Sequence, residues 1–384
     1  MKNDINKNNK KKLLFLIHAF NPGGAQKVLL NLVNAMDLNR YDITIKTVYK
    51  RHEMKAELAP GIKLTSINPF LSKRFSTWFG YLIRRIIPVT WTAKFLIGEN
   101  FDYQVAFLEG EPTYLLSGSK LPKERKIAWV HVNLMKLFNC QGLYKSIEEH
   151  KEVYESYGKV VCVSKDSSRA YTERFGLKAS VLYNLFDERI ISQKSAMQVE
   201  KVTEFKNKSA LNVLMVGNCR PEKGYERMFS VIKRLRDEGI VLNLTVCGGG
   251  IDYDKLIKLK SQLELDSCIN MLGEIKNPYA YMSKSDLFVC SSYSEALSTV
   301  VIESLLVGLP ILTTDIPSMH EILDDGKYGL IVENSEEGLY SGLKGIIQSP
   351  ELLLNYRRIL PNRKEFFSKE NVLKQIDDLF KDIL

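Results

Sequence analysis

The chain has 384 residues, of which 45% are hydrophobic and 26% are charged, and its formal net charge is +9. Because single cores stop growing at roughly 250 to 300 residues, we expect two globular domains and not a disordered chain. No run of about 18 apolar residues is present, so no membrane-spanning helix is expected, and segment 1–11 with the short apolar run after it is not expected to be a secretory signal.

Short aliphatic and β-branched runs alternate with helical patterns in the first half of the chain. After the first run come Gly23 and Gly24, and then an amphipathic helix at 25–36. Ser164 and Gly176 fit the N-cap and the end of a further helix. This alternation predicts a doubly wound parallel sheet covered by helices. The predicted strands are 12–20, 41–49, 62–67, 103–109, 126–132 and 159–164.

A second βα series fills the other half. The polar stretch 190–210 is interpreted as a linker between a domain at 1–189 and a second domain at 211–365, and 366–384 as a C-terminal helix that could pack back on the first domain. Ligands of doubly wound sheets bind beyond the carboxyl ends of the strands, so the loops there should carry the function. The predicted strands are 211–217, 241–247, 268–273, 286–292, 310–315 and 328–333.

Two cations stand in the loop after the strand at 211–217. The loop reads NCRPEKG and places Arg220 and Lys223 three residues apart, directly before a helix. Charge-assisted contacts and the helix dipole both favour an anion such as a diphosphate at this place. A solvated basic loop is the alternative.

Two carboxylates follow the strand at 286–292. Glu295 comes first, and Glu303 lies inside an otherwise apolar helix that Ser298 opens. A buried acid needs hydrogen-bonding partners, and ribose hydroxyls would supply them. The alternative is a Glu295 that lies at the helix N-terminus and a Glu303 that lies at the surface.

These motifs resemble those of family 4 glycosyltransferases. Glu295 and Glu303 match the E-x7-E signature, which is followed by GLPILTTD, NCRPEKG resembles the phosphate-binding loop, and GGAQ at 23–26 resembles an N-terminal glycine turn. The motifs occur in the family's order over nearly the whole chain. The resemblance implies the GT-B fold, in which two Rossmann-like domains face a cleft.

The resemblance also implies roles for single residues. Arg220 and Lys223 would hold the donor diphosphate, and Glu303 would accept hydrogen bonds from ribose. Glu295 would contact hydroxyls of the transferred sugar. Gly23 and Gly24 would let the backbone approach donor phosphate or acceptor, although a plain strand-to-helix turn would also explain them.

Several positions depart from the family or are less specific. Ser298 and Thr299 stand where the family has a glycine-containing turn, so their amides and hydroxyls are expected to contact the diphosphate. Gln26 replaces the usual acid after GGA. His131 ends a strand where the family has an active-site histidine, with a structural histidine as the alternative. Glu109 is a candidate acceptor contact, with a surface acid as the alternative.

No metal and no cofactor are expected. Asp252 and Asp254 form a DxD pair, but they also open a helix, which explains them without a metal. The six cysteines contain no CxxC pair, which favours buried reduced thiols over disulfides or a metal site.

The function predicted is a metal-independent, retaining glycosyltransferase that uses a nucleotide-diphosphate sugar. We favour a UDP-sugar as donor and a lipid-linked glycan as acceptor, at the cytoplasmic face of the membrane in surface polysaccharide or glycoconjugate synthesis. A GT-B phosphorylase, for which no pyridoxal-phosphate lysine is identifiable, and a nucleotide-sugar epimerase are alternatives. The positive charge also admits a nucleic-acid-binding protein, but no zinc spacing or RNP-type motif supports a nucleic-acid partner.

Segment 70–98 is a candidate membrane contact. No Asp or Glu occurs from Leu58 to Gly98, while apolar and aromatic residues alternate with Arg84, Arg85 and Lys94. An interfacial helix pair bent near Pro88 would place its rings at the headgroup level and its cations near anionic lipid. A helical segment packed on the core is the alternative.

Overall fold

The chain folds into two compact units. The computed structural model describes residues 10–68, 89–98, 100–135, 143–201, 205, 207 and 209–381. The first unit contains Met1–Leu185 and Val372–Leu384, and the second contains Phe186–Asn371. Cys140 lies outside the described residues, and the other five cysteines are free and buried, as predicted.

The first unit is built on a seven-stranded sheet with the order β3-β2-β1-β4-β5-β6-β7 and parallel pairing throughout. Residues 13–17 of β1 are fully buried, because helices cover both faces of a parallel sheet. The strands are β1 (Lys11–Ile17), β2 (Tyr41–Tyr49), β3 (Lys63–Asn68), β4 (Tyr103–Ala106), β5 (Lys126–Val130), β6 (Lys159–Cys162) and β7 (Ser180–Val181).

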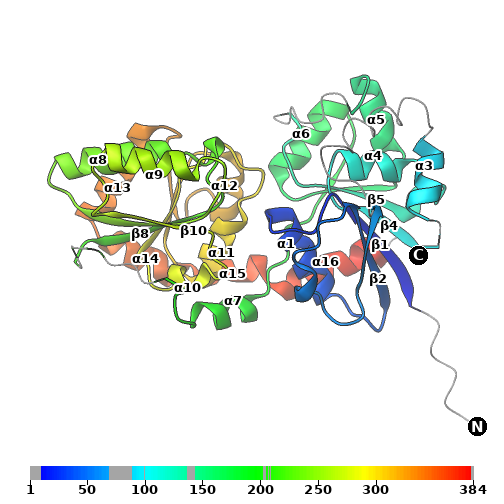
Figure 1. Cartoon of the computed structure of the whole chain (residues 1–384), viewed down its shortest axis with the longest axis horizontal. Coiled ribbons are helices and arrows are strands. Elements are labelled where there is room, and N and C mark those ends of the chain that lie inside the picture. Colours follow the sequence, from blue (N-terminus) through cyan, green and yellow to red (C-terminus); the bar gives the residue numbers. More distant parts are fainter. Residues whose placement is uncertain are drawn as a thin grey trace, which may run out of the picture. The chain divides into compact units, whose positions relative to one another are not determined.

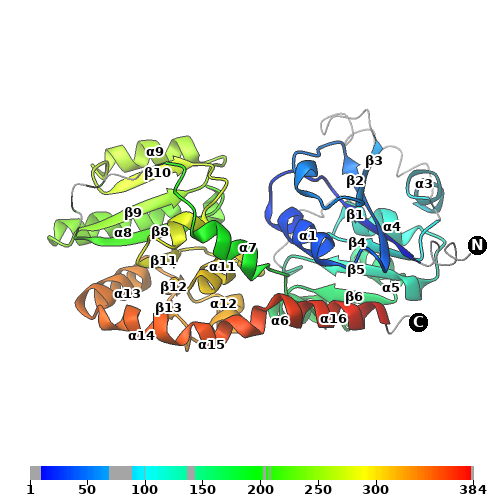
Figure 2. The same ribbon diagram turned by 90° about the horizontal axis from the view of Figure 1, so that it is seen from below.

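Helices lie on both faces of the first sheet. Figure 1 shows α3 (Val89–Leu96), α4 (Glu111–Ser117), α5 (Ile147–Glu155) and α6 (Lys165–Phe175) on one face, and α1 (Gly24–Ala35) and α16 (Lys369–Lys381) on the other. α16 runs beside β6 (Figure 2), where Lys159 donates a hydrogen bond to Leu379 O at 3.1 Å. The Phe380 ring packs on Tyr41 and Tyr103.

The second unit repeats this design with a six-stranded parallel sheet of order β10-β9-β8-β11-β12-β13. α8 (Tyr225–Asp237), α9 (Tyr253–Gln262) and α13 (Glu336–Gln348) cover one face, and α10 (Tyr279–Met282) and α11 (Thr299–Val307) lie on the other (Figure 1). The strands are β8 (Leu211–Val216), β9 (Leu242–Cys247), β10 (Ile269–Gly273), β11 (Leu287–Cys290), β12 (Ile311–Thr314) and β13 (Leu330–Val332), and further helices include α12 (Pro317–Leu323), α14 (Glu351–Ile359) and α15 (Pro361–Lys364).

The stretch 190–210 differs from the linker that its composition suggested. It belongs to the second unit, and its first residues lie in α7 (Glu188–Ser195). Asn277 donates a hydrogen bond to Lys194 O at 2.8 Å, and Ser283 donates one to Ser195 O at 2.7 Å. The stretch is polar because only Ile191 of α7 is buried.

Both sheets have a switch point where the strand order changes direction. β1 lies between β2 and β4, and β8 lies between β9 and β11. In the first sheet the chain continues from β1 to β2 on one side, and β4 begins the other side; in the second sheet β8, β9 and β11 are arranged in the same way. In a doubly wound fold the carboxyl ends of the two strands at such a point, β1 and β4 or β8 and β11, flank a crevice. The loops after β1, β4, β8 and β11 are therefore where site residues should gather.

Candidate active site

Lys223 and Glu295 meet at the switch point of the second sheet. The Lys223 ammonium lies 2.5 Å from Glu295 Oε1, and the Ser292 hydroxyl donates a hydrogen bond to the same oxygen at 2.7 Å. The two charged side chains are 24% and 13% exposed. Burial disfavours the Lys223 charge, but the Glu295 carboxylate outweighs burial and raises the pKa of Lys223 above its ordinary value. Lys223 therefore stays a cation at physiological pH.

Arg220 lies in the same loop but is more exposed than Lys223. Its guanidinium is 3.9 Å from the Glu222 carboxylate, and its side chain is 55% exposed. The loop ends at Gly224, whose φ of +65° favours glycine, and a Cβ there would lie 2.2 Å from Ser291 O. The close contact between this loop and the loop after β11 thus requires glycine.

The glycine run 248–250 packs against the start of the loop that carries Arg220. A Cβ on Gly248 would lie 1.8 Å from Gly217 O, and a Cβ on Gly250 would lie 2.5 Å from Cys219 O. The Cys219 amide donates a hydrogen bond to Gly249 O at 2.7 Å. The two loops after β8 and β9 are therefore packed backbone against backbone.

Arg227 is a site residue that the sequence analysis missed. This buried side chain donates to Ser291 O at 2.8 Å, to Ser292 O at 2.9 Å and to Asn334 Oδ1 at 2.9 Å. Its guanidinium also lies 3.9 Å from the centroid of the Tyr293 ring. Arg227 thus fixes the segment that leads to Glu295. Its position on an amphipathic helix looked like that of an ordinary polar residue.

α11 brings together the other predicted donor contacts. Ser298 precedes the helix, is 2% exposed, and its hydroxyl has no hydrogen-bond partner among the described residues. Thr299 is the first helical residue and is partly buried. Glu303 is only 3% exposed, and its Oε1 accepts a hydrogen bond from the Tyr279 hydroxyl at 2.8 Å. Glu303 is therefore a buried carboxylate and not a surface acid.

Gly23 and Gly24 lie in the loop after β1. Neither has the positive φ that favours glycine. A Cβ on Gly24 would meet nothing within 4 Å, and a Cβ on Gly23 would meet the flexible side chain of Gln26. The fold of the first unit therefore has room for a side chain at Gly24.

His131 and Glu109 are neighbours at the carboxyl ends of β5 and β4. The His131 amide donates a hydrogen bond to Glu109 Oε2 at 3.0 Å. Burial raises the pKa of Glu109, opposed by hydrogen bonds from the His131 and Glu109 amides. Burial also lowers the pKa of His131 to about 3, and its Nε2 has no hydrogen-bond partner among the described residues. The ring packs on Phe107 and Trp129. His131 is thus a neutral imidazole at physiological pH.

A second group in the first unit was also missed. The Tyr49 hydroxyl donates to Glu111 Oε2 at 2.6 Å, and His18 Nδ1 lies 3.6 Å from the same oxygen. The His18 and Tyr49 rings are stacked, with centroids 6.3 Å apart. The three residues follow β1, end β2 and begin α4, so sheet order brings them together and no local spacing signals them.

Two buried histidines predict how stability depends on pH. Burial, and secondarily Arg174, lowers the pKa of His150 to about 4, and His131 has a pKa of about 3. Both histidines bind a proton more readily in the unfolded chain than in the folded protein. Their contribution to the stability of the folded protein is therefore present above about pH 6.5 and is lost as pH falls toward their folded pKa values. We expect the free energy of unfolding to fall by up to about 1.4 kcal/mol per pH unit for each histidine. Urea unfolding of His150→Phe between pH 6.5 and 4.5 should show a shallower fall, and an unchanged slope would contradict the assignment.

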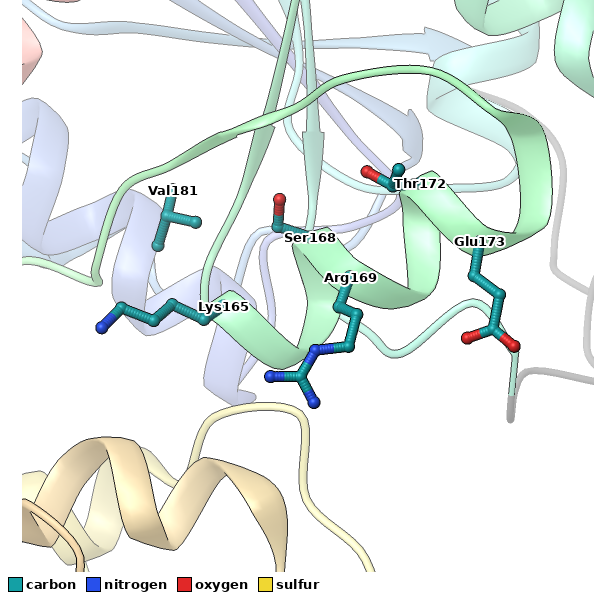
Figure 3. A pocket seen from close by; sticks show the side chains of 6 residues that line it. All are labelled: Lys165, Ser168, Arg169, Thr172, Glu173 and Val181. Atoms are coloured by element: carbon teal, nitrogen blue, oxygen red, sulfur yellow. The ribbon is translucent and has the colours of Figure 1, made fainter.

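A shallow hollow of about 500 Å³ lies on α6 of the first unit (Figure 3). Its charged residues are of both signs, so it does not indicate one class of ligand. The lining residues are Lys165, Ser168, Arg169, Thr172, Glu173 and Val181.

Asp252 and Asp254 of the DxD pair lie at the start of a helix, as predicted. Asp252 precedes α9, and Asp254 is in the first turn of that helix. Among the residues that the structure describes, no three His, Cys, Asp or Glu side chains gather closely enough to hold a metal ion. Over the same residues, no helix is both long and apolar enough to cross a bilayer.

Comparisons with known proteins agree with this arrangement. Residues 198–362, which contain Arg220, Lys223, Glu295 and Glu303, match the family model "Glycosyl transferases group 1". A relative from Campylobacter jejuni, an N-acetylgalactosamine-N,N'-diacetylbacillosaminyl-diphospho-undecaprenol 4-alpha-N-acetylgalactosaminyltransferase, is 24% identical over 381 residues, covering 94% of this chain and 97% of the relative. The O-antigen biosynthesis glycosyltransferase WclY of Escherichia coli is 26% identical over 191 residues, covering 49% and 53%.

A solved structure extends the likeness to both units. Anabaena Alr3699/HepE in complex with UDP-glucose superposes with a TM-score of 0.73 at 17% identity, covering 97% of this chain and 99% of that one. The two parallel Rossmann-like sheets confirm the fold predicted from the sequence. The chain has the GT-B fold of glycosyltransferases, and its residues 198–362 match the model of the glycosyl transferases group 1 family.

Proposed function

We propose that the chain is a retaining glycosyltransferase of family 4 that moves a sugar from a nucleotide-diphosphate donor to a glycan acceptor. The observation that supports the proposal most strongly is the pair of Lys223 and Glu295 at the switch point, within residues 198–362 that match the group 1 model. Lys223, which stays protonated at physiological pH, can bind a diphosphate, and the Glu295 carboxylate beside it can accept hydrogen bonds from sugar hydroxyls. The buried carboxylate of Glu303, on the helix that follows Glu295 in the chain, suits hydrogen bonds from ribose hydroxyls.

The donor diphosphate would lie against Lys223 and Arg220 and at the N-terminus of α11. The unpartnered Ser298 hydroxyl supports this placement, because a buried hydroxyl without a partner is costly and a phosphate oxygen would satisfy it. Thr299 would add its amide and hydroxyl. The room at Gly24 supports a close approach of donor or acceptor to the backbone after β1.

The reaction would form the bond from the acceptor oxygen to the anomeric carbon on the face from which the diphosphate leaves. The bond from the anomeric carbon to the diphosphate oxygen breaks, and that oxygen takes the acceptor proton. Lys223 and Arg220 stabilise the charge that grows on the leaving group, which is the largest contribution expected of the protein. His131, neutral at working pH, would give a hydrogen bond to the sugar.

A UDP-sugar donor and a lipid-linked acceptor complete the proposal. The donor choice is supported by the likeness to HepE, which was solved with UDP-glucose. The acceptor choice is supported by the relative whose name specifies a diphospho-undecaprenol substrate, and WclY supports a role in surface polysaccharide synthesis. Glu109 would contact the acceptor, because it lies beside His131.

Donor binding can be tested by thermal shift against UDP, GDP, ADP and their sugars. One of them should stabilise the protein, since a ligand at 100 times its dissociation constant adds about 2.7 kcal/mol. We propose metal-independent binding and transfer, so EDTA should change neither. If no nucleotide diphosphate shifts the transition, the proposal is wrong.

We further propose that α3 contacts an anionic membrane from the cytoplasmic side. Trp91 and Phe95 are 62% and 74% exposed, while Ala93 between them is buried. Lys94 is also exposed and adds a cation to α3. Arg84 and Arg85 lie outside the described residues. An exposed aromatic pair with a neighbouring cation suits the headgroup level of an anionic bilayer.

Cosedimentation with vesicles tests this contact. Binding should occur with phosphatidylglycerol vesicles, weaken with salt, and fall about tenfold in a Trp91→Ser/Phe95→Ser variant. Ile251→Ser is the matched control, because Ile251 is 80% exposed but lies on the second unit. Equal binding to neutral vesicles, or equal loss in both variants, would contradict the proposal.

A further inference from the structure

Tyr279 and Glu303 form a buried pair that joins two helices of the second unit. The Tyr279 hydroxyl donates to Glu303 Oε1 at 2.8 Å, and the two residues are 4% and 3% exposed. Tyr279 begins α10, and Glu303 lies in the middle of α11. A carboxylate buried this deeply keeps one orientation only if hydrogen-bond donors hold it.

The position of Glu303 along α11 relates it to the diphosphate region. Thr299 and Glu303 are four residues apart and therefore share a helix face. Glu303 lies about 6 Å along the axis from the helix N-terminus, where the unpartnered Ser298 hydroxyl marks the expected phosphate contact. In a nucleotide, ribose is bonded directly to the diphosphate, so ribose hydroxyls would reach this part of α11.

We propose that Tyr279 is a positioning residue that orients the Glu303 carboxylate toward the ribose hydroxyls, and that it thereby sets the preference of this site for ribonucleotides over 2′-deoxyribonucleotides. The proposal rests on the function proposed above. A carboxylate can accept about four hydrogen bonds, so Glu303 can accept hydrogen bonds from a ribose diol and from the Tyr279 hydroxyl at the same time. A site built to bind hydroxyl groups rejects analogues that lack them.

Tyr281 supplies a matched control on the same helix. It is also 4% exposed, and its hydroxyl donates to Lys201 O at 3.0 Å and accepts from the Lys201 amide at 2.8 Å. Tyr281→Phe therefore removes an equally buried, hydrogen-bonded hydroxyl from α10 without removing the bond to Glu303. Any general loosening of α10 should affect both variants.

The experiment is calorimetric titration of UDP and 2′-deoxy-UDP into the wild type, Tyr279→Phe and Tyr281→Phe. The wild type should bind UDP more tightly than 2′-deoxy-UDP. Tyr279→Phe should weaken UDP binding about tenfold and 2′-deoxy-UDP binding much less, so that the preference shrinks. Tyr281→Phe should leave the ratio of the two affinities unchanged.

Each contrary outcome has a distinct meaning. An equal loss for both nucleotides in Tyr279→Phe, or an unchanged ratio, would overturn the role of Tyr279, since a merely structural residue lowers both affinities together. Glu303→Ala tests the function beneath it. If Glu303→Ala binds UDP and 2′-deoxy-UDP like the wild type, the ribose site itself is wrong, and the role of Tyr279 fails with it.

Discussion

Replacing Lys223 with alanine should lower the turnover number on the order of 100-fold, because the lost cation stabilises charge that grows as the diphosphate leaves. Arg220→Ala should have an effect of the same order. Because the pKa of Lys223 is raised, its contribution should persist across the neutral and mildly alkaline range. The measurement is the rate of donor turnover at saturating nucleotide sugar.

The matched control for Lys223 is Lys255→Ala. Lys255 also pairs with a glutamate, Glu226, at 2.7 Å, but its side chain is 65% exposed on α9. This substitution should leave turnover unchanged. Urea unfolding of the Lys223 variant should show that the second unit is still folded, because Ser292 continues to hydrogen-bond Glu295. Normal turnover in both Lys223→Ala and Arg220→Ala would contradict the assignment of these residues to the diphosphate site.

Gly248→Ala should destabilise the second unit by about 3 kcal/mol, the upper range for forcing an added methyl into a packed interior. The new Cβ would lie 1.8 Å from Gly217 O, which belongs to rigid backbone and cannot swing away. The loop that carries Arg220 must then shift, so nucleotide affinity should fall as well. Urea unfolding and nucleotide titration measure the two effects.

Gly345→Ala is the control for this prediction. Gly345 lies within α13, and a Cβ there would meet nothing within 4 Å. Alanine is favoured over glycine in a helix by up to about 1 kcal/mol, so this variant should be slightly more stable than the wild type. A Gly248→Ala protein as stable as wild type would show that the loops after β8 and β9 are not packed as described.

Much of the fold could be predicted because the pattern of a parallel sheet is local. The runs that became β1 and β8 are continuous apolar stretches, which is how strands covered on both faces look in a sequence. The loops with Arg220 and Glu295 could be located because they follow such strands directly. The stretch 190–210 was misread because α7 is short and mostly exposed, so its composition resembles that of a linker.

The rest of the site depends on contacts between distant segments. Arg227 looked like a solvent-facing residue of an amphipathic helix, and nothing near it in sequence indicates that Ser291 and Ser292 accept its hydrogen bonds. Tyr279 is similar, since its partner Glu303 is 24 residues away in another helix. Strand order and helix packing determine which of these distant residues meet, and the spacing of residues within one segment does not reveal them.

The most direct test of the account is the configuration of the sugar released when water replaces the acceptor. The protein would be incubated with an α-linked UDP-sugar, or with the sugar of the base that binds best, and the first product would be followed by proton NMR before mutarotation. The account predicts that the α anomer appears first and that EDTA does not slow its release. Initial release of the β anomer would contradict a retaining glycosyltransferase.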